Sequence, residues 1–339
     1  MSQGRWQDLR AALALWIKEP GSRRQFARAL RYDLDKNASR FVVQAVKQLP
    51  SAPAPAARKL VFFAHYDPQD EVDPYVVFYL RQLRNLGCEI IFVSGSPWLK
   101  PESAAAIRND CAGIYTQHTL SLDFGCWNLA WQQARRRGWT LQGFDQLILA
   151  NDSVYGPLFP LGEIFSHFNG ADLCGVTESL EGKPHLQSYF LAFNLNDRTR
   201  KFVEVFWSKF RYVVPKLHLI QRYEIGLSQQ ARTEGLELKA YISSQATRQA
   251  VLDDEQHQHR AEALERDVNS MLYLWDILIS RFRCPFLKTD LPKYNRYGSR
   301  TMERLEEFLR HSTEYDPRLI ENHLRRLGFR RGSDTSSIK

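Results

Sequence analysis

Short hydrophobic runs of strand length alternate with stretches of helical spacing through the middle of the chain. A continuous apolar run bounded by turn residues is typical of a strand buried on both faces, whereas apolar positions three and four apart indicate a helix. The expected strands are Leu60–His65, Glu89–Ser94, Gly113–Gln117, Gln146–Ala150 and Asp172–Thr177, and the expected helices are Pro74–Leu86 and Pro101–Asp110. Strands separated by helices predict an α/β fold with a mainly parallel sheet.

The second half of the chain is less regular and favours helices. The expected elements are a strand over Leu186–Phe193, helices over Arg198–Tyr212, Arg222–Glu234 and Val268–Phe282, and two charged helices within Met302–Leu327 that break near Asp316-Pro317. Polar residues 253–260 predict a loop. We therefore divide the chain into a sheet domain over 59–245, a helical extension over 246–329 that completes the site, and a disordered tail over 330–339.

The first 58 residues predict a basic helical arm that ends in a Pro/Ala linker. Residues 1–59 carry twelve lysines and arginines against four acids, which accounts for the whole net charge of +8. Such an arm can lie on an anionic membrane surface or can be a solvated helical face, and the sequence leaves both open. The remainder of the chain is formally neutral, which argues against a nucleic-acid interface.

Neither a membrane-spanning segment nor a disulfide framework is expected. The longest stretch without a charged residue, 184–196, is shorter than the roughly 20 apolar residues that a membrane helix needs. The five cysteines are an odd number and widely spaced. We therefore expect reduced thiols in a cytoplasmic protein, with peripheral attachment to the inner face of the membrane through the basic arm as an open alternative.

Polar residues follow two of the expected strands, at the edge where parallel α/β sheets bind ligands. Tyr66 and Asp67 end the first strand with an aromatic ring and an acid, which suit a nucleotide. Asn151, Asp152 and Ser153 follow the strand that ends at Ala150. A carboxylate such as Asp152 can hold a divalent cation that neutralises a diphosphate, and it can also merely cap a turn.

Asp123 lies in the segment Leu122-Asp123-Phe124-Gly125, which invites a kinase interpretation. That interpretation fails because no Gly-rich phosphate loop and no His-Arg-Asp element accompany it. Asp123 can instead stand at the start of a helix that runs to Arg137 and accept hydrogen bonds from a ribose or a base. Plain N-capping of the helix is the alternative.

Glu224 stands in Arg222-Tyr223-Glu224-Ile225-Gly226, at the expected start of an amphipathic helix. In an inverting glycosyl transfer a carboxylate must deprotonate the acceptor hydroxyl, and Glu224 has that chemistry. A glutamate in a first turn can also serve only to stabilise the helix dipole.

Two further segments carry candidate binding groups. His185, Gln187 and Ser188 stand beside aromatic residues before an apolar strand, a composition that suits a carbohydrate acceptor. Lys288 follows the apolar turn Cys284-Pro285-Phe286 and can reach a phosphate or water.

The order of these segments resembles the rhamnan synthesis F family of bacterial polysaccharide enzymes. The likeness spans about residues 59–290, and its most specific elements are NDSVYGPLFPL and HLQSYF. It implies a glycosyltransferase, often of L-rhamnose from a dTDP-linked donor, that acts on a lipid-linked or growing polysaccharide acceptor in O-antigen or cell-wall glycan synthesis.

The segment order also resembles the nucleotide-sugar fold called GT-A, in which a metal-binding D-x-D motif ends a central strand. The corresponding triplet here is Ala150-Asn151-Asp152, so only the last acid is present. This departure leaves Asp152 as the sole clear ligand for Mg²⁺ or Mn²⁺ and puts strict metal dependence in doubt. By position, Glu224 resembles the catalytic base of inverting members.

The sequence thus predicts a GT-A-like glycosyltransferase of the hexosyltransferase type, with a nucleotide-sugar donor and a glycan or lipid-linked acceptor. Tyr66, Asp67, Asp123, Asn151, Asp152, Ser153 and Lys288 would bind the donor, His185, Gln187 and Ser188 the acceptor, and Glu224 and Asp152 would act in catalysis. Two alternatives remain: a retaining transferase of the same fold, and a non-catalytic basic adaptor that binds a membrane or nucleic acid.

Overall fold

The computed structural model describes residues 43–54, 56–117, 121–213, 216–255, 257–260, 268–294 and 305–329. Most of the predicted basic arm, residues 1–42, and the predicted tail, residues 330–339, lie outside the described residues. The helical arm and the disordered tail therefore stay predictions.

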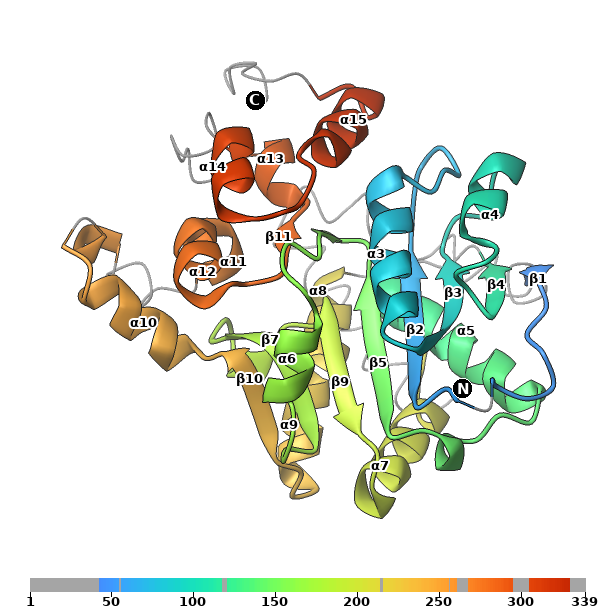
Figure 1. Cartoon of the computed structure of the whole chain (residues 1–339). Coiled ribbons are helices and arrows are strands. Elements are labelled where there is room, and N and C mark those ends of the chain that lie inside the picture. The colour runs from blue at the N-terminus through green and yellow to red at the C-terminus, as the bar shows by residue number, and fades with distance from the viewer. Residues whose placement is uncertain are drawn as a thin grey trace, which may run out of the picture.

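A nine-stranded sheet forms the centre of the described structure, in the order β1-β4-β3-β2-β5-β9-β7-β10, with β8 paired to β7 beside this path (Figure 1). The strands are β1 (Gln44–Lys47), β2 (Lys59–His65), β3 (Cys88–Ser94), β4 (Gly113–Thr116), β5 (Gln146–Asn151), β7 (Leu173–Ser179), β8 (His185–Leu186), β9 (Phe190–Asn194) and β10 (Leu238–Ile242). Neighbours from β4 to β5 pair in parallel, as do β7 and β10, whereas β9 runs antiparallel to β5 and β7. The predicted α/β class with a mainly parallel sheet is confirmed.

The apolar run of β2 places this strand at the centre of the sheet. Val61 and Phe63 pack into one hydrophobic core, and Phe62 and Ala64 pack into the core on the opposite face. All four side chains are fully buried. A strand that is covered on both faces needs such a continuous apolar run, which explains why its sequence pattern is easy to recognise.

Helices cover both faces of the sheet. The first core lies under α3 (Pro74–Asn85), α4 (Pro101–Ile107) and α6 (Gly162–His167). The second lies under α5 (Leu122–Arg136), α7 (Asp197–Ser208) and α9 (Gly226–Thr233). A short 3-10 helix, η1 (Leu141–Gly143), precedes β5.

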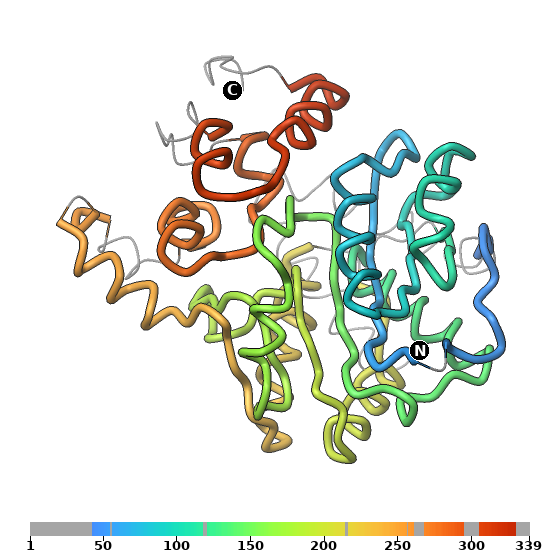
Figure 2. Tube along the Cα trace, in the orientation of Figure 1, coloured from blue at the N-terminus to red at the C-terminus, as the bar shows by residue number. Residues whose placement is uncertain are grey.

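The C-terminal segment returns across one end of the sheet to reach α3, as the tube in Figure 2 shows. Its elements are α10 (Ser244–Leu252), α11 (Ser270–Tyr273), α12 (Trp275–Phe282), β11 (Leu287–Lys288), α13 (Asp290–Tyr294), α14 (Leu305–Ser312) and α15 (Arg318–Arg326). The predicted break near Asp316-Pro317 is confirmed, because Pro317 is the N-cap of α15. The segment also contains a strand, since β11 pairs antiparallel with β6 (Val154–Tyr155).

The expectation of a helical arm and linker up to residue 58 was wrong over its last part. Residues 44–47 form β1, which pairs antiparallel with the edge strand β4. Leu49 is fully buried, and Lys47 Nζ donates to the carbonyl oxygens of Arg108 and Cys111 at 2.8 and 2.6 Å. These long-range contacts attach residues 43–50 to the sheet, so Lys47 is not free to bind a membrane.

Three further elements differ from the sequence expectation. The predicted strand Leu186–Phe193 is interrupted after β8 and resumes as the antiparallel β9. The predicted helix Arg198–Tyr212 ends at Ser208, as α7. The predicted helix Arg222–Glu234 begins earlier, with α8 (Lys216–Leu219), and continues through the π-helix η2 (Ile220–Ile225) into α9.

The remaining expectations concern membranes and thiols. None of the described helices is long and apolar enough to cross a membrane. All five cysteines are buried and unpaired, as expected. Burial raises the pKa of each thiol, which makes these side chains unreactive.

Candidate active site

The carboxyl ends of β2 and β5 bring the predicted residues Tyr66 and Asp152 into contact. The two strands are parallel neighbours with Ala64 level with Asn151. The backbone N–H of Tyr66 therefore reaches Asp152 Oδ2 and donates a hydrogen bond of 3.0 Å. Asp152 thus joins two strands and is followed by β6, so the structure does not show it as a helix or turn cap.

The side chain of Asp152 lies in a mostly buried position beside His65. His65 Nε2 is 3.8 Å from Asp152 Oδ2, and burial lowers the pKa of His65 to about 4, so the imidazole is neutral at pH 7. Burial raises the pKa of Asp152 to about 8. The hydrogen bond from the Tyr66 N–H lowers this pKa, and the charge of Asp123 raises it. Asp152 can therefore hold a proton near neutral pH.

Asn151 connects this strand end to Asp123. Asn151 Nδ2 donates to Asp123 Oδ2 at 2.8 Å, and Asn151 Oδ1 accepts from the Ser153 N–H and hydroxyl at 3.1 and 2.6 Å. Asp123 stands in the first turn of α5, after the N-cap Ser121, so capping does not explain it. Burial, followed by the charge of Glu224, raises the pKa of Asp123 to about 6.

Glu224 lies inside a helical run and not at its start. The run begins at Lys216, and Glu224 belongs to the π-helical segment η2, a departure from the α-helix that is frequent at functional sites. The helix-dipole alternative for Glu224 is therefore wrong. The backbone N–H and the hydroxyl of Ser188 both donate to Glu224 Oε1, at 3.1 and 3.0 Å.

The other two predicted acceptor residues have different partners. His185 is buried on β8, and its Nδ1 lies 2.8 Å from the carbonyl oxygen of Lys183. Gln187 is also buried, and its Oε1 accepts from the Thr177 hydroxyl at 2.7 Å. Of the three predicted acceptor residues, the structure brings Ser188 to Glu224, whereas His185 and Gln187 have contacts that shape the segment around it.

Lys288 reaches the site because β11 pairs with β6. Lys288 is level with Val154, and the N–H of Thr289 donates to the carbonyl oxygen of Ser153 at 2.9 Å. Lys288 Nζ lies 4.9 Å from the centre of the Tyr189 ring. Burial lowers the pKa of Lys288, and the charges of Glu224 and Asp123 oppose that shift, which places the three groups in one electrostatic environment.

Lys293 on α13 is a residue that the sequence interpretation missed. Burial lowers its pKa, and the charge of Asp152 is the largest opposing influence. The charge of Asp152 thus favours the charged form of Lys293, as the charges of Glu224 and Asp123 favour the charged form of Lys288. A lysine within a short, polar helix gives no signal of such a role in the sequence alone.

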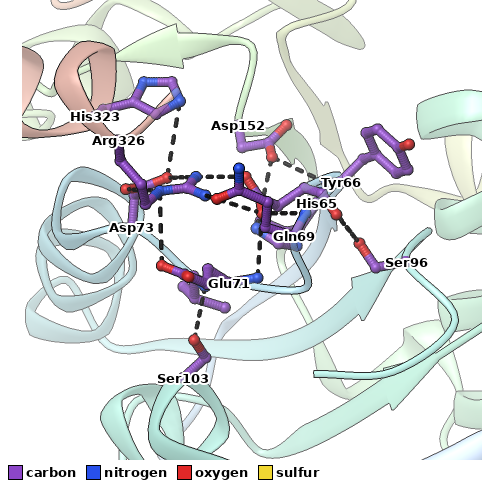
Figure 3. Close-up of polar contacts among 12 residues, drawn as sticks. His65, Tyr66, Gln69, Glu71, Asp73, Ser96, Ser103, Asp152, His323 and Arg326 are labelled. Carbon is purple, nitrogen blue, oxygen red and sulfur yellow. Dashed lines mark hydrogen bonds and ion pairs between the residues drawn. The ribbon is translucent and has the colours of Figure 1, made fainter. Parts of the chain in front are cut away.

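Tyr66 and Asp67 differ in what surrounds them, although they are consecutive. Tyr66 is 59% exposed, and Figure 3 shows its ring directed away from the neighbouring cluster of charged side chains. Asp67 is buried, and its carboxylate accepts hydrogen bonds from Arg326 and from the N–H groups of Gln69 and Glu71. The ring of Tyr66 is accessible to a ligand, whereas a nucleotide contact of Asp67 stays a prediction.

A divalent cation at this edge would have few protein ligands. The described residues contain no group of three or more His, Cys, Asp or Glu side chains that could hold a metal ion. Asp152 offers one carboxylate, and Mg²⁺ can be held by one or two carboxylates when substrate phosphates and water supply the remaining oxygens. The donor set therefore fits a cation that arrives with a diphosphate, with Asp152 as its protein ligand.

Similarity to individual known proteins is low. A search of curated proteins gives no match. Among solved structures, the chain is similar to the glycosyltransferase GlyE from Streptococcus pneumoniae TIGR4, with 13% sequence identity and a TM-score of 0.38. That similarity covers 82% of this chain and 66% of the GlyE chain, so it spans just under two thirds of that structure.

The profile of the family described as rhamnan synthesis protein F matches residues 90–333. The match begins later than the resemblance over 59–290 and extends further toward the C-terminus. Residues 300–333, which the sequence interpretation left outside the likeness, are therefore part of the family pattern, and with them α14 and α15. Since the matched region is well over half of the chain, this protein belongs to the rhamnan synthesis protein F family.

Proposed function

We propose that this protein is a glycosyltransferase that uses a nucleotide-sugar donor and the side chains at the carboxyl edge of its sheet. The observation that carries the proposal is the edge where β2 and β5 end, at which the Tyr66 N–H donates to Asp152 and Asn151 donates to Asp123. The charges of Asp123, Glu224 and Lys288 act on one another there, and Ser188 holds Glu224. Family membership supports the same conclusion. A GT-A-like mode of donor binding is part of this proposal.

Glu224 is the proposed catalytic base. An acceptor hydroxyl that attacks the anomeric carbon must lose its proton, and a positioned carboxylate takes that proton as the new C–O bond forms. The bond between the anomeric carbon and the diphosphate oxygen breaks at the same time, and the diphosphate leaves with the electron pair. The two hydrogen bonds from Ser188 to Oε1 fix the carboxylate for this role.

The donor side is proposed to lie along β2 and β5. The exposed ring of Tyr66 is available to stack on a base, and Asp123 can accept hydrogen bonds from ribose hydroxyls. Asn151, Asp152 and Ser153 would organise the diphosphate, with Lys288 and Lys293 as nearby positive charges. Preorganised charges that face a leaving diphosphate stabilise the transition state in which that charge develops.

The finer assignments rest on the resemblance noted in the sequence. They are L-rhamnose from a dTDP-linked donor, a lipid-linked or growing polysaccharide acceptor and an inverting outcome. A cytoplasmic location rests instead on the unpaired cysteines, and peripheral attachment to the inner face of the membrane would depend on the basic arm. The anomeric configuration of the product separates an inverting from a retaining enzyme, because Glu224 would not act as base in the latter.

A thermal-shift screen tests the proposal against a non-catalytic adaptor. Ligands that bind the folded protein raise its melting temperature. We expect dTDP or UDP to raise it and duplex DNA to leave it unchanged. Stabilisation by DNA without any response to nucleotides would favour the adaptor.

A further inference from the structure

Arg326 on the C-terminal helix α15 contacts the loop that connects β2 to α3, and His323 Nε2 on the same helix lies 3.7 Å from Asp73 Oδ2. Arg326 Nη2 donates to Asp67 Oδ2 and to Asp73 Oδ2, both at 2.5 Å, and its Nε donates to Asp73 Oδ1 at 3.0 Å. Arg326 Nη1 donates to Gln69 Oε1 at 2.8 Å and to Asp67 Oδ1 at 3.2 Å. Figure 3 shows the guanidinium beside Asp73, Gln69 and Glu71.

This single side chain holds both ends of the loop. Asp67 is the second residue after β2, and Asp73 is the N-cap of α3. Arg326 is 259 residues from Asp67 in the chain. A planar guanidinium with five donors can bridge two carboxylates and an amide at once, which a lysine cannot do.

The acidic side chains of the loop need the positive charge of Arg326 to stay in their buried positions. Asp67 and Asp73 are buried, and Glu71 Oε2 lies 3.7 Å from Arg326 Nε. Three carboxylates therefore surround one guanidinium. Removal of the positive charge would leave the two buried carboxylates without their cation, an arrangement that proteins tolerate poorly.

The backbone at residues 66 and 67 connects this cluster to the donor side of the site. The N–H of Asp67 donates to Ser96 Oγ at 3.1 Å, and that hydroxyl donates back to the Asp67 carbonyl oxygen at 2.7 Å. The residue before Asp67 is Tyr66, whose N–H donates to Asp152 Oδ2. Asp67, which Arg326 and Ser96 hold, is thus the direct neighbour of the residue whose N–H contacts Asp152 and whose ring is exposed.

His323, one turn earlier in α15, gives the helix a second anchor. Its Nδ1 lies 2.8 Å from the hydroxyl of Tyr155 on β6, and its ring lies 4.8 Å from that of Tyr75 on α3. Both contacts are buried. The helix is therefore fixed against the β5–β6 segment as well as against the loop before α3.

We propose that Arg326 is a positioning residue for donor binding: it fixes the loop of residues 66–73 so that Tyr66 faces the base of the donor and its N–H holds Asp152 toward the diphosphate. This inference rests on the proposed function, because it assumes that these two residues meet a donor. Arg326 itself has its donors engaged by the loop, so its contribution passes through Asp67 and Asp73.

The test compares Arg326→Lys with Arg325→Lys in the full-length protein. Arg325 is exposed on the same helix and provides the matched control. We expect Arg326→Lys to weaken dTDP or UDP binding at least tenfold in calorimetry and to raise the donor KM more than it lowers kcat. Hydrogen exchange over residues 66–73 should become faster, and Arg325→Lys should match the wild type in all three measurements.

If Arg326→Lys does not fold, the double variant Arg326→Gln with Asp73→Asn replaces it, because it removes one acid together with the cation. Faster exchange in the loop with unchanged nucleotide affinity would overturn the positioning role while leaving the proposed function intact. A wild-type protein that binds no nucleotide would overturn the proposed function and this inference with it, whatever the exchange measurement shows.

Discussion

Ser188 donates both its backbone N–H and its hydroxyl to one oxygen of Glu224, at 3.1 and 3.0 Å. A similar pair occurs elsewhere in the chain, where Ser244 donates its N–H and hydroxyl to Glu178 Oε2 at 3.3 and 2.8 Å. Ser244 is the first residue of α10, so this second pair anchors a helix start. The two pairs have similar chemistry and different surroundings, and together they give a matched comparison.

The first prediction compares Glu224→Gln with Glu178→Gln. A glutamine keeps the size of the side chain and accepts hydrogen bonds but cannot take the proton, and general-base catalysis is worth about 10² to 10⁴ in rate. We expect Glu224→Gln to lower kcat by that factor and to leave the donor affinity nearly unchanged. Glu178→Gln should lower the melting temperature slightly and keep kcat within about threefold. Normal turnover by Glu224→Gln would exclude Glu224 as the base and direct attention to Asp123.

The second prediction concerns Asp152→Asn. We expect turnover to fall at least a hundredfold, because the amide cannot supply a negative charge when a diphosphate and its cation arrive. EDTA should slow the wild type without abolishing turnover, since Lys288 and Lys293 remain as positive charges near the site. Loss of all wild-type activity in EDTA, restored by Mn²⁺, would instead make the cation indispensable.

Stability provides an independent measurement on the same variant. The folded protein holds the Asp152 proton up to a pKa of about 8, far above the ordinary value of an aspartate. The stability that the wild type gains from this proton is present below about pH 4 and is lost as the pH rises toward 8. The melting temperature of Asp152→Asn minus that of the wild type should therefore increase as the pH rises from about 4 to about 8. A constant difference would mean that the pKa of Asp152 is not shifted.

The third prediction is a pH dependence that arises from Asp123. Burial and the neighbouring charge of Glu224 raise its pKa to about 6, so it becomes protonated as the pH falls through that value. The neutral acid accepts hydrogen bonds from donor hydroxyls less well, and kcat/KM should fall below about pH 6. Asp123→Asn should be less active and should lack this acid limb. In Glu224→Gln the pKa of Asp123 should move down, which carboxyl ¹³C chemical shifts can measure.

The fourth prediction concerns deletion of the N-terminal arm. Deletion of residues 1–42 should leave the melting temperature unchanged, and it should release the protein from anionic liposomes if the arm binds them. Deletion of residues 1–50 also removes β1 and the buried Leu49, so the melting temperature should fall by several degrees. Equal liposome binding by the full-length protein and the 1–42 deletion would eliminate the membrane role of the arm.

The parts of the fold that the sequence predicted well have strong local patterns. The run Lys59–His65 has apolar residues for both faces of a central strand, and Asp316-Pro317 directly precedes α15. β1 escaped prediction because an edge strand of four residues has little pattern of its own and depends on its pairing with β4. The π-helix around Glu224 has no distinct sequence signal, since the same residues fit an ordinary helix.

In the candidate site, too, the sequence indicated only the residues that follow a strong local pattern. Asp152, Asn151 and Tyr66 were recognisable because they directly follow apolar strands, and the parallel sheet brings strand ends together. Arg326 was not recognisable, because an arginine in the last turn of a charged helix is the ordinary complement of the helix dipole. Its partners Asp67 and Asp73 lie at the other end of the chain, and their pairing depends on how the C-terminal segment returns across the sheet.

The most direct test of the central claim is the release of free nucleotide from a panel of nucleotide sugars, measured with the wild type and with Glu224→Gln. We predict that one donor, with dTDP-L-rhamnose as the first choice, yields nucleotide release and sugar transfer by the wild type. The same reaction should be at least a hundredfold slower with Glu224→Gln, at unchanged nucleotide affinity. Absence of turnover with every donor, together with no thermal stabilisation by dTDP or UDP, would contradict the account.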